Sequence, residues 1–132
     1  THEKGLLGHS DADVLIHAII DAMLGALCLD DIGTLFPDTD PKYKDIDSTV
    51  LLKHVYELVQ SKGYKIVNID SNIIAQVPKM MPYIPKMKDV LCRVLKINPE
   101  QLSIKAKTKE KMDAVGQKLA IEANAVILIS KV

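Results

Sequence analysis

The chain has 132 residues, in which 17 Lys and Arg residues are balanced by 17 Asp and Glu residues. This length is enough for one domain with a core, and the balanced charge argues against a nucleic-acid-binding protein. The longest apolar stretch, residues 14–29, contains His17 and Asp21 and is shorter than the ~20 residues that a membrane-spanning helix needs.

The first expected element is a helix over about residues 11–29. Ser10 is a suitable amino-terminal cap, and Asp13 takes the third helical position, as in a capping box. Asp13, His17 and Asp21 follow one another at intervals of four residues and form a polar stripe on an otherwise apolar helix. Such a stripe can coordinate a cation, but it is also compatible with a capped helix whose His has a partner in the core.

The following elements alternate between helices and strands. A Gly-, Pro- and Asp-rich loop over residues 30–45 is long enough to suggest a function. After it the sequence predicts a helix from Asp47–Ser48 to a cap at Gly63, a strand over 65–76, a helix opened by Pro85, and strands over 102–107 and 123–130. These elements indicate a single α/β (α+β) domain over residues 1–132. Cys28 and Cys92 lie in apolar helical patterns, which predicts buried, reduced thiols.

Four blocks rich in polar residues, Gly or Pro stand at the boundaries of these elements. They are His9-Ser-Asp-Ala-Asp-Val…His17, Asp31-Ile-Gly-Thr-Leu-Phe-Pro-Asp-Thr-Asp40, Ile74-Ala-Gln-Val-Pro-Lys-Met-Met-Pro82 and Lys105-Ala-Lys-Thr-Lys-Glu-Lys111. From the residues alone, the second block can be a turn, the third a turn with two core methionines, and the lysines a solvated sheet edge. Thr108 and Glu110 interrupt the lysines, and a hydroxyl beside a carboxylate can hold a phosphate and Mg²⁺.

In order and spacing the four blocks resemble the signature of the 2-C-methyl-D-erythritol 2,4-cyclodiphosphate synthases of the non-mevalonate route to isoprenoids. The resemblance implies a phosphorus–oxygen lyase with a mixed sheet of about four strands covered by helices. It also implies homotrimers with active sites between subunits. The implied reaction converts 4-diphosphocytidyl-2-C-methyl-D-erythritol 2-phosphate to 2-C-methyl-D-erythritol 2,4-cyclodiphosphate and CMP. Because the attacking phosphate is already anionic, catalysis would consist of positioning and charge stabilisation.

The resemblance also assigns roles to residues of each block. The implied catalytic residues are His9 and Thr108. The implied binding site for the methylerythritol end of the substrate consists of His9, Ser10, Asp31, Ile32, Gly33, Phe36, Pro37, Asp38, Thr39 and Asp40. The implied site for the nucleotide end consists of Ala75, Gln76, Val77, Pro78, Lys79, Met80, Met81, Lys107, Thr108, Lys109 and Glu110.

Two metal sites are implied by the resemblance, zinc on His17 and Mg²⁺ or Mn²⁺ on Glu110 and the diphosphate. The family's zinc site also uses an Asp-x-His pair on its first strand, and the sequence has no such pair before His9. We therefore expect a fragment that lacks the family's first strand or strands, in which Asp13 or Asp21 supports His17.

Two other functions compete with cyclisation. A non-catalytic nucleotide- or isoprenoid-binding trimer would keep the nucleotide loop, and a zinc-dependent nucleotide pyrophosphatase would use water as its nucleophile. No nucleic-acid or membrane partner is expected. The excess of Lys over Arg and the segment Gly116-Gln-Lys-Leu-Ala-Ile favour a plastid-type organelle, with the bacterial cytoplasm as the alternative.

Overall fold

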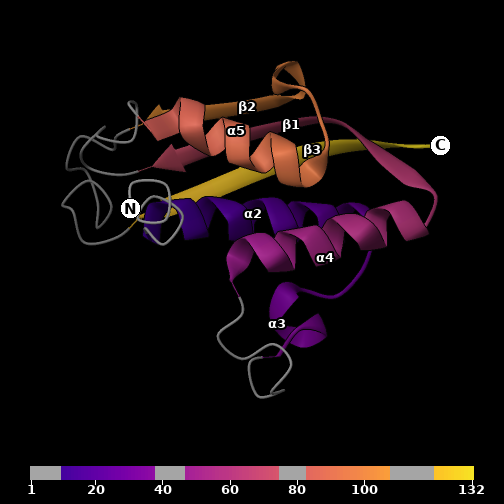
Figure 1. Ribbon diagram of the computed structural model, residues 1–132. Coiled ribbons are helices and arrows are strands. Elements are labelled where there is room, and N and C mark those ends of the chain that lie inside the picture. Colours follow the sequence, from indigo (N-terminus) through magenta and orange to yellow (C-terminus); the bar gives the residue numbers. More distant parts are fainter. Residues whose placement is uncertain (1–9, 38–46, 75–82, 108–120) are drawn as a thin grey trace.

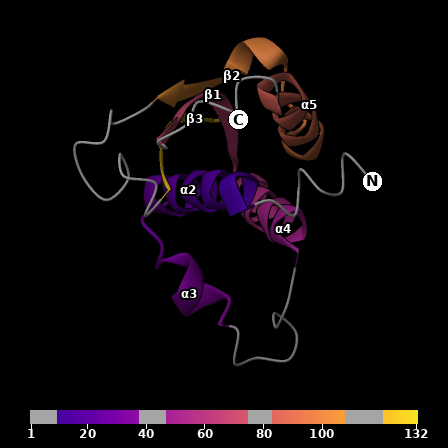
Figure 2. The ribbon, with the colours of Figure 1, turned by 90° about the vertical axis from the view of Figure 1, so that its left-hand side faces the viewer.

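The computed structural model describes residues 10–37, 47–74, 83–107 and 121–132 (Figure 1). The elements in chain order are α2 (Ser10–Ala26), α3 (Ile32–Leu35), α4 (Ser48–Ser61), β1 (Tyr64–Ile74), α5 (Ile84–Leu95), the 3-10 turn η2 (Pro99–Gln101), β2 (Leu102–Lys107) and β3 (Glu122–Lys131). In the described residues α2, α4 and α5 lie on one side of the sheet, and no helix covers the other side (Figures 1 and 2). None of these helices is long and apolar enough to cross a membrane.

The described sheet has three strands in the order β2-β1-β3. The central strand β1 pairs in parallel with β2, where Ile69 faces Leu102, and antiparallel with β3, where Ile69 faces Ile127. The pairing with β3 shifts between Ile66 and Asn68. An extra residue at such a bulge offsets the alternation of faces, so that Ile66 and Ile69 are both buried although they are three residues apart. The prediction of a mixed sheet is confirmed, with three described strands rather than about four.

The apolar face of α2 contributes more buried residues to the described core than any other element. Ile19, Ile20 and Met23 are fully buried there, and they pack with residues of α4, α5 and the inner face of the sheet. At ~25 cal/mol per Å² of buried apolar surface, side chains of this size each stabilise the fold by about 1.5–3 kcal/mol. The helix that carries His17 is therefore firmly held in the domain.

Local signals in the sequence explain where most elements begin and end. Asp47 caps α4 by accepting a hydrogen bond from the backbone N–H of Thr49 at 2.8 Å, and Gly63 follows the helix with a φ of +85°. Pro85 lies in the first turn of α5, where its missing N–H costs no helical hydrogen bond. The predicted bounds of the strand over 102–107 agree with β2.

Four local predictions are wrong. The first helix ends at Ala26 rather than at Leu29, because the chain turns through Cys28, which has a φ of +57°. Cys28 is therefore exposed, whereas Cys92 is buried as predicted, and burial raises the pKa of its thiol. The expected loop over residues 30–45 begins with the short helix α3. Ser10 is the first residue of α2 rather than the cap before it.

One end of the molecule gathers the ends of several elements. The amino-terminal turns of α2, α4 and α5 lie there together with the carboxyl ends of β1 and β2, on the left in Figure 1 and towards the viewer in Figure 2. The parallel pairing of β1 with β2 brings Ile74 and Lys107 to the same edge of the sheet. We call this end of the molecule the strand-end edge.

Candidate functional site

The described residues that flank the four sequence blocks lie mostly at the strand-end edge. Ser10 begins α2, Asp47 precedes α4, Ile74 ends β1, and Lys107 ends β2. The predicted site residues His9, Asp38, Thr39, Asp40, Ala75, Gln76, Val77, Pro78, Lys79, Met80, Met81, Thr108, Lys109 and Glu110 lie outside the described residues. Segments that are far apart in sequence thus leave or enter the described fold near one another.

The predicted polar stripe on α2 has three members with different surroundings. His17 and Asp21 are exposed, and no hydrogen bond or ion pair joins either of them to another described residue. Asp13 is half-buried, and its Oδ1 accepts a hydrogen bond of 2.6 Å from the Ser48 hydroxyl at the start of α4. The interpretation of His17 as a core histidine is wrong.

His17 offers an accessible imidazole, but it is one ligand among the three or four that a protein zinc site needs. The described residues contain no group of three or more His, Cys, Asp and Glu side chains that could hold a metal ion. Asp13 is engaged with Ser48, which leaves Asp21, one helical turn after His17, as the remaining acidic neighbour on α2. The described residues alone therefore do not fit a complete zinc site.

The start of the second block folds into α3. The Asp31 carboxylate caps this helix by accepting a hydrogen bond of 2.9 Å from the backbone N–H of Thr34. Hydrogen bonds from the Thr34 side chain and backbone hold the pKa of Asp31 below its usual range, so that it is anionic at neutral pH. Ile32 packs partly against the core, whereas Gly33 is exposed. Phe36 and Pro37, also in the predicted site, are half-buried.

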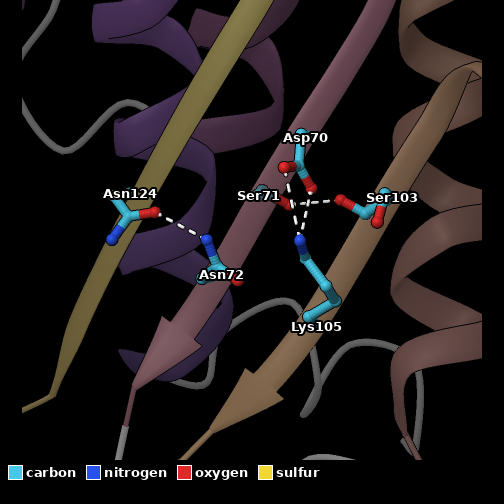
Figure 3. A network of polar contacts seen from close by, with 6 residues as sticks. All are labelled: Asp70, Ser71, Asn72, Ser103, Lys105 and Asn124. Carbon is cyan, nitrogen blue, oxygen red and sulfur yellow. Dashed lines mark hydrogen bonds and ion pairs between the residues drawn. The ribbon is translucent and has the colours of Figure 1, made fainter.

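The fourth block begins on β2, where its two lysines have different roles. The Lys105 ammonium forms an ion pair with Asp70 on β1, with Nζ 3.0 Å from Oδ1 and 3.3 Å from Oδ2 (Figure 3). This contact holds the pKa of the Asp70 carboxyl below its usual value. Lys107 is exposed at the end of the strand, and Thr108 and Glu110 follow it in the sequence. Only Lys107 of these two lysines thus has an ammonium group without a carboxylate partner among the described residues.

Two further polar contacts flank this ion pair. The Ser71 hydroxyl donates to the backbone oxygen of Ser103 at 2.8 Å, and the Asn72 amide donates to Asn124 Oδ1 at 2.9 Å (Figure 3). Asp70, Asn72 and Asn124 were not among the predicted site residues. The alternation of polar Asn68, Asp70 and Asn72 along β1 was a signal in the sequence for a polar sheet face.

A pocket of about 350 Å³ lies between the start of α5 and the end of β2. It is lined by Ile84, Pro85, Ile104, Lys105 and Ala106, none of which was among the predicted site residues. In open α/β sheets, ligands bind in the crevice beyond the carboxyl ends of parallel strands. The expected succession of strand, helix and strand over 65–107 could have indicated such a crevice, although not its lining.

Comparison with known proteins decides the family. The model of the YgbB family matches residues 1–130. The chain belongs to the YgbB family. Among the curated relatives of this YgbB chain, one from Geobacillus thermodenitrificans is 55% identical over 130 residues, which are 98% of this chain and 81% of the relative. One from Clostridioides difficile is 57% identical over 128 residues, 97% of this chain and 80% of the relative. Both are named 2-C-methyl-D-erythritol 2,4-cyclodiphosphate synthase.

Solved structures with the YgbB fold agree with this assignment. The bifunctional IspDF of Campylobacter jejuni has a TM-score of 0.86 and 37% identity, over 94% of this chain and 34% of that chain. The CDP complex of IspF from Plasmodium falciparum has a TM-score of 0.81 and 42% identity, over 95% of this chain and 75% of that chain. The resemblance inferred from the four blocks is thus confirmed.

Proposed function

We propose that this chain is a cyclodiphosphate synthase of isoprenoid precursor biosynthesis, a phosphorus–oxygen lyase. Its substrate is 4-diphosphocytidyl-2-C-methyl-D-erythritol 2-phosphate, and its products are 2-C-methyl-D-erythritol 2,4-cyclodiphosphate and CMP. The observation that carries the proposal is the 57% identity to a relative with this name over 97% of the chain. A match of this extent includes all four sequence blocks.

The chemistry is an internal displacement at phosphorus. An oxygen of the 2-phosphate attacks the β-phosphorus of the CDP group, and the bond from that phosphorus to the oxygen of the α-phosphate breaks. CMP leaves with this oxygen, and water is not consumed. Since the nucleophile is part of the substrate, the protein must hold both phosphates close together and stabilise the developing charge.

The pocket between α5 and β2 supports a nucleotide site at the strand-end edge. Residues 75–81 follow β1 directly, and the second proposed nucleotide-binding segment begins with Lys107 at the end of β2. Along the chain, both segments lie within a few residues of those that line this pocket. A CDP complex is known for the relative from Plasmodium falciparum. We assign the methylerythritol end of the substrate to His9, Ser10, residues 31–33 and residues 36–40, and charge stabilisation to His9 and Thr108.

The proposed metal ions would neutralise phosphate charge when bound. We keep Glu110 as the contact of Mg²⁺ or Mn²⁺, because a carboxylate beside a diphosphate suits these hard cations. His17 is the proposed zinc ligand within the described residues, and its exposed imidazole leaves it accessible. Its remaining ligands are not among the described residues, and we assign no step of the reaction to zinc.

The open face of the sheet supports the proposed homotrimer. Val126 and Leu128 on β3 are 73% and 59% exposed, next to the Asn72–Asn124 contact. Large apolar side chains side by side on an uncovered strand are typical of an interface. The curated relatives named above are bacterial, which favours the bacterial cytoplasm over the plastid-type organelle.

Product analysis tests the proposed function and its two competitors. The purified protein is incubated with the substrate and Mg²⁺, and the phosphorus spectrum is followed with time. We expect equimolar CMP and cyclic diphosphate. CMP together with uncyclised 2-C-methyl-D-erythritol 2,4-bisphosphate would instead indicate a pyrophosphatase, and an unchanged substrate that still binds would indicate a non-catalytic binding protein.

A further inference from the structure

The contact between Asp13 and Ser48 joins the starts of two helices that are distant in sequence. The Ser48 hydroxyl donates to Asp13 Oδ1 at 2.6 Å, Asp13 is half-buried, and Ser48 is 9% exposed. In Figure 1, α4 lies beside α2 and runs in the same direction, so that their amino-terminal turns are neighbours. A short hydrogen bond from a hydroxyl to a carboxylate is of the charge-assisted kind, about twice as strong as one between neutral groups.

Ser48 does not serve as the cap of its own helix. That role belongs to Asp47, whose carboxylate accepts hydrogen bonds from both the backbone N–H and the hydroxyl of Thr49. The Ser48 hydroxyl is therefore free to bind across to α2. The hydrogen bond therefore fixes the first turn of α4 against the turn of α2 that contains Asp13. Because Asp13 and His17 are four residues apart, this turn lies on the same helix face as His17 and directly precedes it.

In sequence, these two turns adjoin segments of the proposed site for the methylerythritol end of the substrate. Ser10 begins α2, and residues 38–46, which include Asp38 to Asp40, stand directly before Asp47 in sequence. The proposed nucleotide site adjoins other elements, namely β1, β2 and α5. We propose that Asp13 and Ser48 are a positioning pair that fixes α4 on α2 and thereby sets affinity for the methylerythritol end, independently of CMP. This inference rests on the proposed function.

The substitutions Ser48→Ala and Asp13→Ala test the pair. Loss of one charge-assisted hydrogen bond should raise KM for the full substrate about tenfold. The dissociation constant of CMP, measured by calorimetry, should stay within twofold of that of the parent protein. Asp13→Asn keeps an oxygen that accepts the Ser48 hydrogen bond, and its KM should lie closer to that of the parent protein than to that of Asp13→Ala. This variant also tests the pair if an alanine variant fails to fold.

Thr49→Ala is the matched control, because it removes a hydroxyl hydrogen bond on the same helical turn, and Thr49 has no hydrogen bond to α2 among the described residues. We expect it to lower the melting temperature and to leave KM and CMP affinity unchanged. A parental KM in Ser48→Ala would overturn the positioning role, as would an equal KM rise in Thr49→Ala or a parallel loss of CMP affinity. An inactive parent protein would refute the proposed function itself. An active parent protein whose KM is unchanged by Ser48→Ala would refute only the positioning role of the pair.

Discussion

His17, Asp13 and Lys105 all belong to polar sequence blocks, yet the structure gives them different surroundings. His17 is exposed, Asp13 binds Ser48, and Lys105 pairs with Asp70. Sequence spacing predicts which side chains share a face, but a partner 35 positions away depends on how the elements pack. For this reason the stripe on α2 was predictable, whereas the Asp13–Ser48 and Lys105–Asp70 contacts were not.

The Asp70–Lys105 ion pair should make stability depend on pH. Because the folded-state pKa of Asp70 is lowered by Lys105, its contribution is present above the unfolded-state pKa and is lost as the pH falls through the folded-state pKa. Lys105→Met should therefore lower the melting temperature at pH 7 and have no effect at a pH below both values. The control is Lys65→Met, since Lys65 is an exposed residue of β1 without an ion pair among the described residues. The same loss for Lys105→Met at both pH values would contradict this account.

Glu110 is the residue whose substitution tests the proposed magnesium contact. Glu110→Gln should lower turnover by about 10²- to 10³-fold, the usual cost of removing a group that stabilises developing charge. Steady-state CMP release across a magnesium titration measures this. Glu100→Gln, at an exposed carboxylate in η2, is the control and should behave like the parent protein. If Glu110→Gln keeps the parental turnover and magnesium dependence, the assignment fails.

At the scale of the elements, local signals were enough to predict most of the fold. Asp47, Gly63 and Pro85 mark helix boundaries through caps and backbone geometry that depend on a few neighbouring residues. The early end of α2 at Ala26 was not predictable from these signals, because Leu27 and Leu29 continue the apolar pattern while they pack against the core from a turn. The bulge of β1 depends on its pairing with β3, which the order of elements does not specify.

The two glycines Gly25 and Gly63 give a matched test of this reading of the elements. Neither has a neighbouring atom within 4 Å of an added Cβ, so alanine fits at both positions. Gly63→Ala should lower the free energy of unfolding by about 1–2 kcal/mol, because its φ of +85° strains any L side chain. Gly25→Ala should raise it by about 0.5–1 kcal/mol, because Gly25 lies inside α2. Urea denaturation at one protein concentration measures both, and effects of the same sign would contradict the account.

At the scale of the whole molecule, the sequence predicted which blocks contribute to the proposed site but not how they meet. The parallel pairing of β1 with β2 brings the flanks of the third and fourth blocks to the strand-end edge, beside the start of α2. The pocket under α5 was missed, because its lining consists of apolar residues and a lysine that have ordinary roles in a helix and a strand. Packing, rather than composition, creates that pocket.

The open sheet face should control assembly. Val126→Lys together with Leu128→Lys should convert the proposed trimer to monomers, because buried ammonium groups would lose their hydration without gaining partners. Analytical ultracentrifugation measures the mass. Val50→Lys changes an exposed residue of α4, away from the sheet, and should leave assembly intact. A trimer that survives the double substitution, or a parent protein that is already monomeric, would contradict the proposed interface.

The most direct test of the proposed reaction is the fate of solvent oxygen. The protein is incubated with the full substrate in water enriched in ¹⁸O, and both products are analysed by mass spectrometry. Because cyclisation consumes no water, we predict CMP and a cyclic diphosphate that both carry no ¹⁸O. One ¹⁸O atom incorporated for each CMP released would contradict the account and would show that water, not the 2-phosphate of the substrate, attacks phosphorus.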